Sequence, residues 1–417
     1  MTENRSGFDP QKAFAALRHR NFRLFWFGQC ISLTGTWMQE IAQAWLVLEL
    51  TKSAFWLGVV SAVQFLPMLL LSLYAGFVID RFPKRNLLIL TQSAMLVLAF
   101  LLALDTQLGT VNRWHVLIFA GLLGLVNTFD MPTRQSLMVE LVGKEDLMNA
   151  IVLNSTVFNA ARVIGPSVAG FALASLGTDS CFYLNALSFI PVIIGITLIR
   201  LERRPTAPVP LQTGVWADIQ DGLRHIWKTP QILLPIALVA IINVFVLNFN
   251  VLVPLYAKNV FHGGAQDLGL LMSANGLGAL AGAFLLTARG DNRPKTKTLA
   301  VAAAGICLAE LFLVPVKSPL VAYLLLAMAG FAMIAFSTTA NSLIQMQAPD
   351  HLRGRIMSVY ALVFMGFTPF GSFLSGSVAH LWGAPAAFGL GAGISLLLVI
   401  ALILNFAPLF RGESRLL

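Results

Sequence analysis

The stretch Gly76–Arg85, GFVIDRFPKR, separates two long apolar runs of the sequence. Gly76 allows two helices to approach closely, as small residues do in membranes. Asp80 comes where the chain should leave lipid, and Pro83 ends a helix. The two basic residues that close the stretch are typical of a cytoplasmic loop. The stretch therefore predicts a tight cytoplasmic connection between two membrane-spanning helices.

The composition is that of a membrane protein. Of the 417 residues, 57% are hydrophobic and 11% are charged, whereas soluble domains carry about 25% charged residues. The net charge of +9 does not indicate nucleic-acid binding, because the basic residues lie in short segments between apolar runs. Cys30, Cys181 and Cys307 lie far apart within such runs and give no disulfide or metal spacing. We expect them to be packing residues, and we expect no metal or cofactor.

Apolar segments long enough to span a bilayer, about 20 residues each, recur along the whole chain. They predict an all-α integral membrane protein with about twelve transmembrane helices. The predicted spans are residues 22–49, 56–79, 87–105, 114–131, 149–174, 181–200, 232–256, 267–288, 298–316, 319–341, 356–380 and 384–408.

The distribution of Lys and Arg predicts the orientation. All but five of the 28 fall at one set of span ends, and the side with the positive charge is cytoplasmic. Both termini are therefore predicted to be cytoplasmic. The first apolar run is too long for a cleavable signal, which fits a bacterial inner membrane. The exceptions are Lys52, Arg113, Lys258, Lys317 and Arg162.

The chain divides into two halves around a Pro-rich linker. We predict a six-helix bundle at 1–200, a cytoplasmic linker at 201–230 with an amphipathic helix from Val215 to Trp227, and a second bundle at 231–417. The halves repeat weakly, since an offset of 211 residues aligns Leu57-Gly58 with Leu268-Gly269. Two parallel six-helix bundles related by a pseudo-twofold axis are an architecture that transporters use.

The loop resembles the signature GxLaDrxGrkxxl between the second and third spans of the major facilitator superfamily. Further stretches, such as LNSTVFNAARVIGPSVAG at 153–170 and LRGRIMSVY at 352–360, are similar to its macrolide-efflux and enterobactin-exporter branch. The resemblance implies secondary active export, usually coupled to proton entry, without fixing the cargo. Pro83 stands where the signature usually has Gly. The matching loop positions are Gly76, Asp80, Arg81, Lys84 and Arg85.

The fifth predicted span contains RVIGPSVAG at 162–170, which is similar to the antiporter signature gxxxGPxxGG. Proline removes a backbone hydrogen bond and bends a helix, and small residues allow close helix contact. The resemblance implies a contact between the two halves that opens and closes; the alternative is an ordinary kinked helix. The positions concerned are Ala161, Gly165, Pro166, Ala169 and Gly170.

Ionisable groups inside spans are costly and are functional candidates. Glu40 and Arg162 lie about 27 Å and about 20 Å from the predicted inner ends of their spans, at 1.5 Å per residue. We predict that both face the cavity and interact, so that Glu40 could take up a proton during transport. The alternatives are a static buried pair, or a Glu40 that reaches the outer surface. Glu310, in the ninth span, is more consistent with a structural role.

A cytoplasmic gate is predicted around the inner end of the fourth span. Asp130 and Arg134 flank Pro132 there, and the family fold brings this end near Asp80. We predict that Asp80 pairs with Arg134 and meets the positive end of the eleventh helix, which closes the cytoplasmic side when the transporter faces outward. The alternative is an exposed ion pair that contributes little.

Polar side chains gather in the first, fourth, seventh and tenth spans, which line the central pathway in the family fold. For any one amide, a hydrogen bond between helices is as good an explanation as substrate contact. The cavity candidates are Gln39, Gln43, Asn127, Asn243, Asn248 and Asn341.

The sequence therefore favours a proton-coupled exporter of small amphiphilic compounds, a drug or a siderophore, that acts as a monomer. The alternatives are an importer or facilitator on the same fold, or a membrane sensor that does not transport. No enzyme motif and no phosphate-binding loop occurs in the sequence, so neither catalysis nor direct ATP drive is expected.

Overall fold

The computed structural model describes residues 14–143, 145–200, 223–288, 296–349, 352–407 and 409. All long secondary-structure elements of the described residues are α-helices. The first half holds η1 (Ala15–Arg18), α2 (Arg20–Thr51), α3 (Ala54–Arg81), α4 (Lys84–Gln107), α5 (Arg113–Val142), α6 (Leu147–Leu176) and α7 (Thr178–Leu198). The second half holds α9 (Pro230–Phe245), α10 (Phe249–Asn259), α11 (Ala265–Ala288), α12 (Thr296–Leu313), α13 (Pro319–Gln347), α14 (Arg353–Gly366) and α15 (Thr368–Asn405).

These helices cross the membrane twelve times. By length and composition, ten described stretches qualify as spans, and Pro230–Asn259 is one of them although it joins α9 to α10. Arg353–Asn405 is counted once, but the chain reverses at Gly383, whose φ is 85°. Helix α2, with 32 residues, supplies the remaining crossing. The predicted all-α fold with about twelve transmembrane helices is confirmed.

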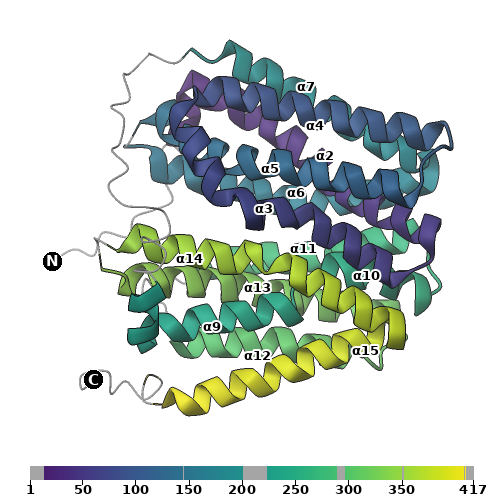
Figure 1. The fold of residues 1–417 in the computed structure, drawn as a ribbon, viewed down its shortest axis with the longest axis vertical. Coiled ribbons are helices and arrows are strands. Elements are labelled where there is room, and N and C mark those ends of the chain that lie inside the picture. The colour runs from purple at the N-terminus through teal and green to yellow at the C-terminus, as the bar shows by residue number, and fades with distance from the viewer. Residues whose placement is uncertain are drawn as a thin grey trace.

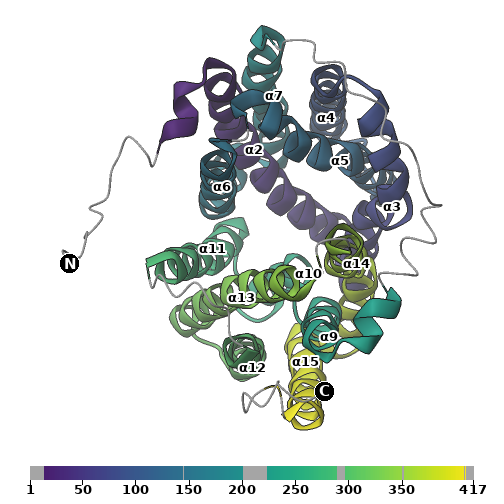
Figure 2. The same ribbon diagram turned by 90° about the vertical axis from the view of Figure 1, so that its left-hand side faces the viewer.

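The helices form two bundles that face each other (Figures 1 and 2): α2 to α7 in one and α9 to α15 in the other. Between them, α6 packs on α11 and α3 packs on α15. Helix α2 begins and α15 ends on the same side of the molecule (Figure 1). We call this side, which holds the connection 82–83, the basic end, and the other side the distal end. Most of the predicted linker, with the start of its amphipathic helix, lies outside the described residues, which resume with a helical segment at 223–228.

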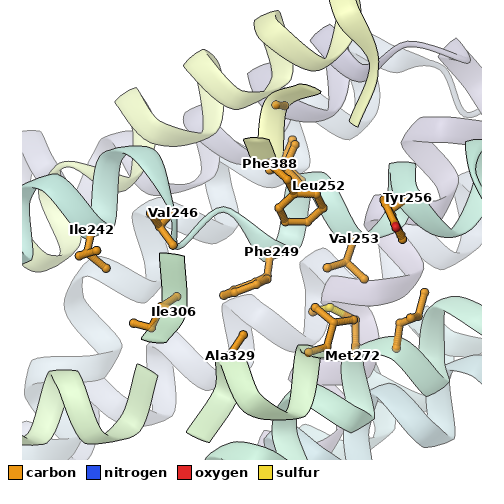
Figure 3. Close-up of a cluster of buried hydrophobic side chains, with 14 of the residues drawn as sticks. Ile242, Val246, Phe249, Leu252, Val253, Tyr256, Met272, Ile306, Ala329 and Phe388 are labelled. Carbon is orange, nitrogen blue, oxygen red and sulfur yellow. The ribbon is translucent and has the colours of Figure 1, made fainter. Parts of the chain in front are cut away.

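The second bundle has a continuous buried apolar core around α9 and α10, part of which Figure 3 shows. Phe249, Leu252 and Tyr256 of α10 pack there with Phe388 of α15. The Tyr256 hydroxyl lies 2.6 Å from the carbonyl oxygen of Leu313 and 2.7 Å from that of Val316. This core holds α10 firmly beside the break at residues 246–248 that separates it from α9. Cys181 and Cys307 are buried and Cys30 is half-buried, all as free thiols.

Candidate functional site

A cavity of about 120 Å³ lies between the two bundles. Five helices contribute to it: α2, α6, α10, α11 and α13, together with the break before α10. Broken helices at the interface of two repeats are where transporters bind substrates, because the break exposes backbone groups to the pathway. The lining residues are Trp37, Arg162, Pro166, Leu247, Phe249, Asn250, Met272, Asn275 and Met333.

Arg162 provides the positive charge of the cavity. Its Nη2 donates to Oδ1 of Asn275, 3.0 Å away, and to Sδ of Met333, 3.4 Å away. Its guanidinium carbon lies 5.9 Å from the centroid of the Trp37 ring, within the range of a cation–π interaction. Arg162 thus reaches from the first half to partners on α11 and α13 of the second. These partners are neutral and do not compensate the charge of the guanidinium.

Glu40 is the acidic group that interacts electrostatically with Arg162. The ion pairs closer than 4.0 Å among the described residues do not include these two. The charges therefore act on each other across a gap, without a direct bond. That Glu40 takes up a proton stays a prediction. Glu310 is 1% exposed, and neither of its carboxylate oxygens has a hydrogen-bond partner; it lies on α12, which does not line this cavity.

The predicted antiporter-like stretch packs α6 against α2 on one side and against α11 on the other. A Cβ on Gly165 would lie 2.5 Å from Cβ of Trp37 in α2, and a Cβ on Gly170 would lie 3.1 Å from Cα of Gly269 in α11. Ala161 and Ala169 are buried, at 2% and 0% exposure. The stretch thus joins the two halves through Gly170.

A second glycine contact repeats this arrangement on α3 and α15. A Cβ on Gly376 would lie 2.7 Å from Cα of Gly58. One turn away, Ser61 donates to Ser372 at 3.0 Å, just as Ser167 and Ser273 share a hydrogen bond of 2.7 Å beside the first contact. The first contact joins α6 to α11 and the second joins α15 to α3, so the pairs follow the weak repeat of the sequence. Both glycine contacts hold the two bundles together in the distal half of the molecule.

The predicted gate residues form contacts within the first bundle. Asp130 is fully buried; its Oδ2 lies 2.6 Å from Nε of Arg134, and its Oδ1 accepts hydrogen bonds from Thr91 and Gln92, both 2.8 Å. Arg134 also donates to Gln29 at 2.7 Å.

Two basic residues of the loop form an ion pair and hydrogen bonds with neighbouring helices. Lys84 pairs with Glu140 of α5 at 2.6 Å, and Arg85 donates to the carbonyl oxygens of Ile196 and Thr197 in α7 at 3.0 and 2.6 Å. A Cβ on Gly76 would meet no atom within 4 Å, and Arg81 is exposed. The side chain of Asp80 lies outside the described part of the structure, so its pairing with Arg134 stays a prediction. Asp80→Asn is expected to weaken transport while leaving the protein in the membrane.

The predicted cavity amides are not among the residues that line this cavity. Gln39 accepts a hydrogen bond from Asn185 at 2.6 Å, and Gln43 donates to Gln64 at 2.8 Å. Both bonds join helices of the first bundle, the alternative explanation for such amides.

The remaining predicted amides have bonds or positions of other kinds, and Asn248 lies in the break before α10. Asn243 donates to the carbonyl oxygen of Phe364 in α14, and Asn248 donates to that of Val244 at 2.9 Å. Asn341 accepts from Gln345 at 2.5 Å, and Asn127 is half-buried. Whether these residues meet substrate in another state of the protein stays a prediction.

Sequence reasoning missed Asn275, Met272 and Met333. Asn275 is 2% exposed and bridges Arg162 to α13, since its Nδ2 donates to the carbonyl oxygen of Leu326 at 3.2 Å. The sequence signal that could have indicated Asn275 is a lone amide in the eighth span, in ANG at 274–276. The two methionines gave no such signal in the sequence, because apolar residues occupy every face of a membrane helix.

Two six-helix bundles, a broken helix at their interface and a charged cavity between them define a transporter of the major facilitator type. The chain belongs to the transmembrane secretion effector family, whose model matches residues 11–415. It is a membrane transporter and not an enzyme.

Curated relatives lie in the branch that the sequence suggested. The chain is 30% identical to the multidrug efflux pump Tap of Mycolicibacterium fortuitum, over 93% of this chain and 96% of that protein. It is 24% identical to the staphyloferrin A transporter of Staphylococcus aureus, over 89% and 93%, and 21% identical to macrolide efflux protein A of Streptococcus pyogenes, over 92% and 94%. Among solved structures, a peptide transporter POT variant in complex with alafosfalin matches with a TM-score of 0.74 at 12% identity, over 97% of this chain and 99% of that one, which shows the shared fold.

Proposed function

We propose that this protein is a proton-coupled exporter of small amphiphilic compounds that works by alternating access. The observation that carries the proposal is the cavity between the halves. It combines Trp37, Phe249 and two methionines, which suit an apolar part of a ligand, with the charge of Arg162. Met side chains adapt to ligands of different shape. The names of the relatives, a multidrug efflux pump, a staphyloferrin A transporter and a macrolide efflux protein, support export of small molecules.

Glu40 is our candidate for the coupling group. Its charge acts on Arg162, so protonation of Glu40 changes the electrostatic balance at the cavity. A proton entering from outside would thereby alter the affinity for cargo. A conformational equilibrium responds to a ligand only through its different affinity for the two states, and this pair supplies such a difference.

The basic loops support an orientation with the basic end in the cytoplasm and the distal end outside. The two glycine contacts then close the outer side, and cargo enters from the cytoplasm. Opening would separate both contacts together, because each joins one half to the other. The complete cavity belongs to one chain, so we expect a monomer to transport.

The test uses purified protein in liposomes that contain a pH-sensitive dye. A proton gradient is imposed, and macrolides, dyes and catecholate siderophores are added in turn. We expect one class to trigger proton flux in the wild type. Glu40→Gln should abolish this flux, whereas Glu310→Gln, the same change at a glutamate on α12 away from the cavity, should retain it.

Two results contradict the proposal. Compound movement without proton flux would indicate a facilitator. Unchanged coupling in Glu40→Gln would remove Glu40 from the mechanism while leaving export intact.

A further inference from the structure

A groove of about 630 Å³ lies outside the transport pathway, between the first part of α2 and the last part of α7. Arg20 and Arg23 lie at its mouth, and its walls carry Phe27, Ile31, Ile194 and Leu198. These four apolar side chains are 49–58% exposed. The groove opens at the basic end, where α2 begins.

Successive residues of α2 show which way the groove faces. Trp26 points to α6, where its Nε1 donates to the carbonyl oxygen of Leu153 at 3.3 Å. Gly28 packs on Val192 of α7, and Gln29 accepts a hydrogen bond from Arg134 of α5. Phe27 is therefore left on the side opposite α5, since successive helical residues are about 100° apart. That side faces away from the bundle, toward lipid.

Two glycines form the floor of the groove. A Cβ on Gly28 would lie 2.6 Å from Cα of Val192, and a Cβ on Gly195 would lie 2.5 Å from the carbonyl oxygen of Leu24. The backbones of α2 and α7 therefore touch, and the larger side chains on either side stand above them. A groove between two touching helices is open along its length, so a flexible acyl chain can lie in it.

The mouth carries two arginines that have no carboxylate partner among the described residues. Both arginines are exposed, and Nη1 of Arg20 donates to the carbonyl oxygen of Leu198 at 3.4 Å, which directs it across the end of α7. No carboxylate of the described residues lies within 4.0 Å of either guanidinium. Arginine forks match phosphate oxygens in geometry and charge.

The length of the groove matches one leaflet. From Arg20 to Ile31 the helix rises about 16 Å at 1.5 Å per residue, and one leaflet of the hydrocarbon core is about 15 Å thick. A lipid whose phosphate lies at the arginines would reach the far end of the groove with its acyl chain. Charge and length therefore favour the same occupant.

We propose that this groove binds an anionic phospholipid, with the phosphate at Arg20 and Arg23 and one acyl chain between α2 and α7. Basic sites between transmembrane helices bind anionic headgroups in this way. The groove shares no lining residue with the cavity between the bundles.

The test is native mass spectrometry of the full chain with equal amounts of phosphatidylglycerol and phosphatidylcholine that carry identical acyl chains. Two arginines near a headgroup are expected to favour the anionic lipid roughly 30-fold. The double variant Arg20→Gln, Arg23→Gln should lose most of this preference, and Arg20→Lys, Arg23→Lys should keep much of it. The matched control Arg224→Gln, Lys228→Gln removes two exposed cations from segment 223–228 and should retain the wild-type preference.

A second variant and a soluble competitor test the acyl chain. Ile31→Trp with Ile194→Trp fills the groove and should lower the binding of both lipids. Glycerol phosphate, a headgroup without acyl chains, should not displace the bound lipid. The proposal is overturned by an unchanged preference in the glutamine variant, by an equal loss in the control, by full lipid binding to the tryptophan variant, or by displacement with glycerol phosphate.

Discussion

The side-chain amine of Lys258 donates a hydrogen bond to the backbone carbonyl oxygen of Leu48, with 3.2 Å between the two atoms. Lys258 ends α10 in the second half, whereas Leu48 lies in the last turn of α2 in the first. The ammonium nitrogen is also 5.3 Å from the centroid of the Trp45 ring, and Trp45 donates to Glu49 at 2.7 Å. A cation from one half thus stabilises the negative end of a helix in the other, at the distal end of the molecule.

Lys258→Met should therefore favour the state that is open at the distal end. The expected shift in the conformational free energy is about 1 kcal/mol, from the helix end and the ring together. The measurement is the spin-label distance between Leu108→Cys and Lys317→Cys, exposed positions at the distal ends of the two halves, in a protein without native cysteines. Lys52→Met is the matched control, because Lys52 is exposed at the end of the same α2. An unchanged distance distribution in Lys258→Met would contradict the inference.

Gly269→Ala should separate α6 from α11. The added Cβ would lie 2.7 Å from the carbonyl oxygen of Pro166, and such overpacking costs about 1–3 kcal/mol. The same label pair should report a larger share of long distances, and transport should slow. Gly264→Ala is the control, since a Cβ there meets no atom within 4 Å. Equal behaviour of the two variants would show that the glycine contact does not hold the distal end closed.

Arg162→Lys keeps the charge but loses the planar fork that reaches Asn275 and Met333. A hydrogen bond from the guanidinium to cargo would contribute about 1.5–3 kcal/mol, and an ammonium does not reproduce the fork, so we expect cargo affinity to fall at least tenfold. Equilibrium binding of the cargo to purified protein measures this. Arg113→Lys is the control, because Arg113 lies 4.9 Å and 5.5 Å from the rings of Trp56 and Trp114 at the distal end, away from the cavity. A fall of the same size in both variants would remove Arg162 from the binding site.

Asp130→Asn should destabilise the first bundle. It leaves the Arg134 guanidinium without its buried counter-ion, and breaking a buried pair costs about 3–5 kcal/mol. Thermal unfolding in detergent should show a clear drop in Tm. Glu140→Gln, which breaks the partly exposed pair with Lys84, should cost about 1 kcal/mol or less. A small effect of Asp130→Asn would mean that Thr91 and Gln92 suffice to hold this site.

Glu310→Met should raise the Tm. Both carboxylate oxygens of Glu310 are buried without hydrogen-bond partners, and each unsatisfied buried group costs about 1–3 kcal/mol. A thioether of similar length removes this penalty and packs among apolar neighbours. The comparison is Ser395→Ala, which removes a single unsatisfied hydroxyl and should stabilise less. A lower Tm for Glu310→Met would indicate that the carboxyl is required for packing.

Local patterns predicted the elements of this fold but not their partners. The connection after α3 and the close helix contact at Gly170 were readable because glycine, proline and charge act on the backbone nearby. The pairing of Arg162 with Asn275 was not, since these residues are far apart in the chain. Likewise, Asp130 and Arg134 were expected near a gate with Asp80, whereas the hydrogen bonds of Asp130 with Thr91 and Gln92 depend on how the bundle packs.

Sequence alone indicates a membrane protein of about twelve helices, because the length of each apolar run must match the thickness of the bilayer. Tertiary structure alone decided which side chains line the cavity and which face lipid. In water, an apolar stripe marks the inner face of a helix, but in a membrane both faces are apolar. Helix rotation is then set by close packing at contacts such as Gly58 with Gly376. In the packed structure, Gln39 and Gln43 face neighbouring helices, whereas Met272 and Met333 line the cavity.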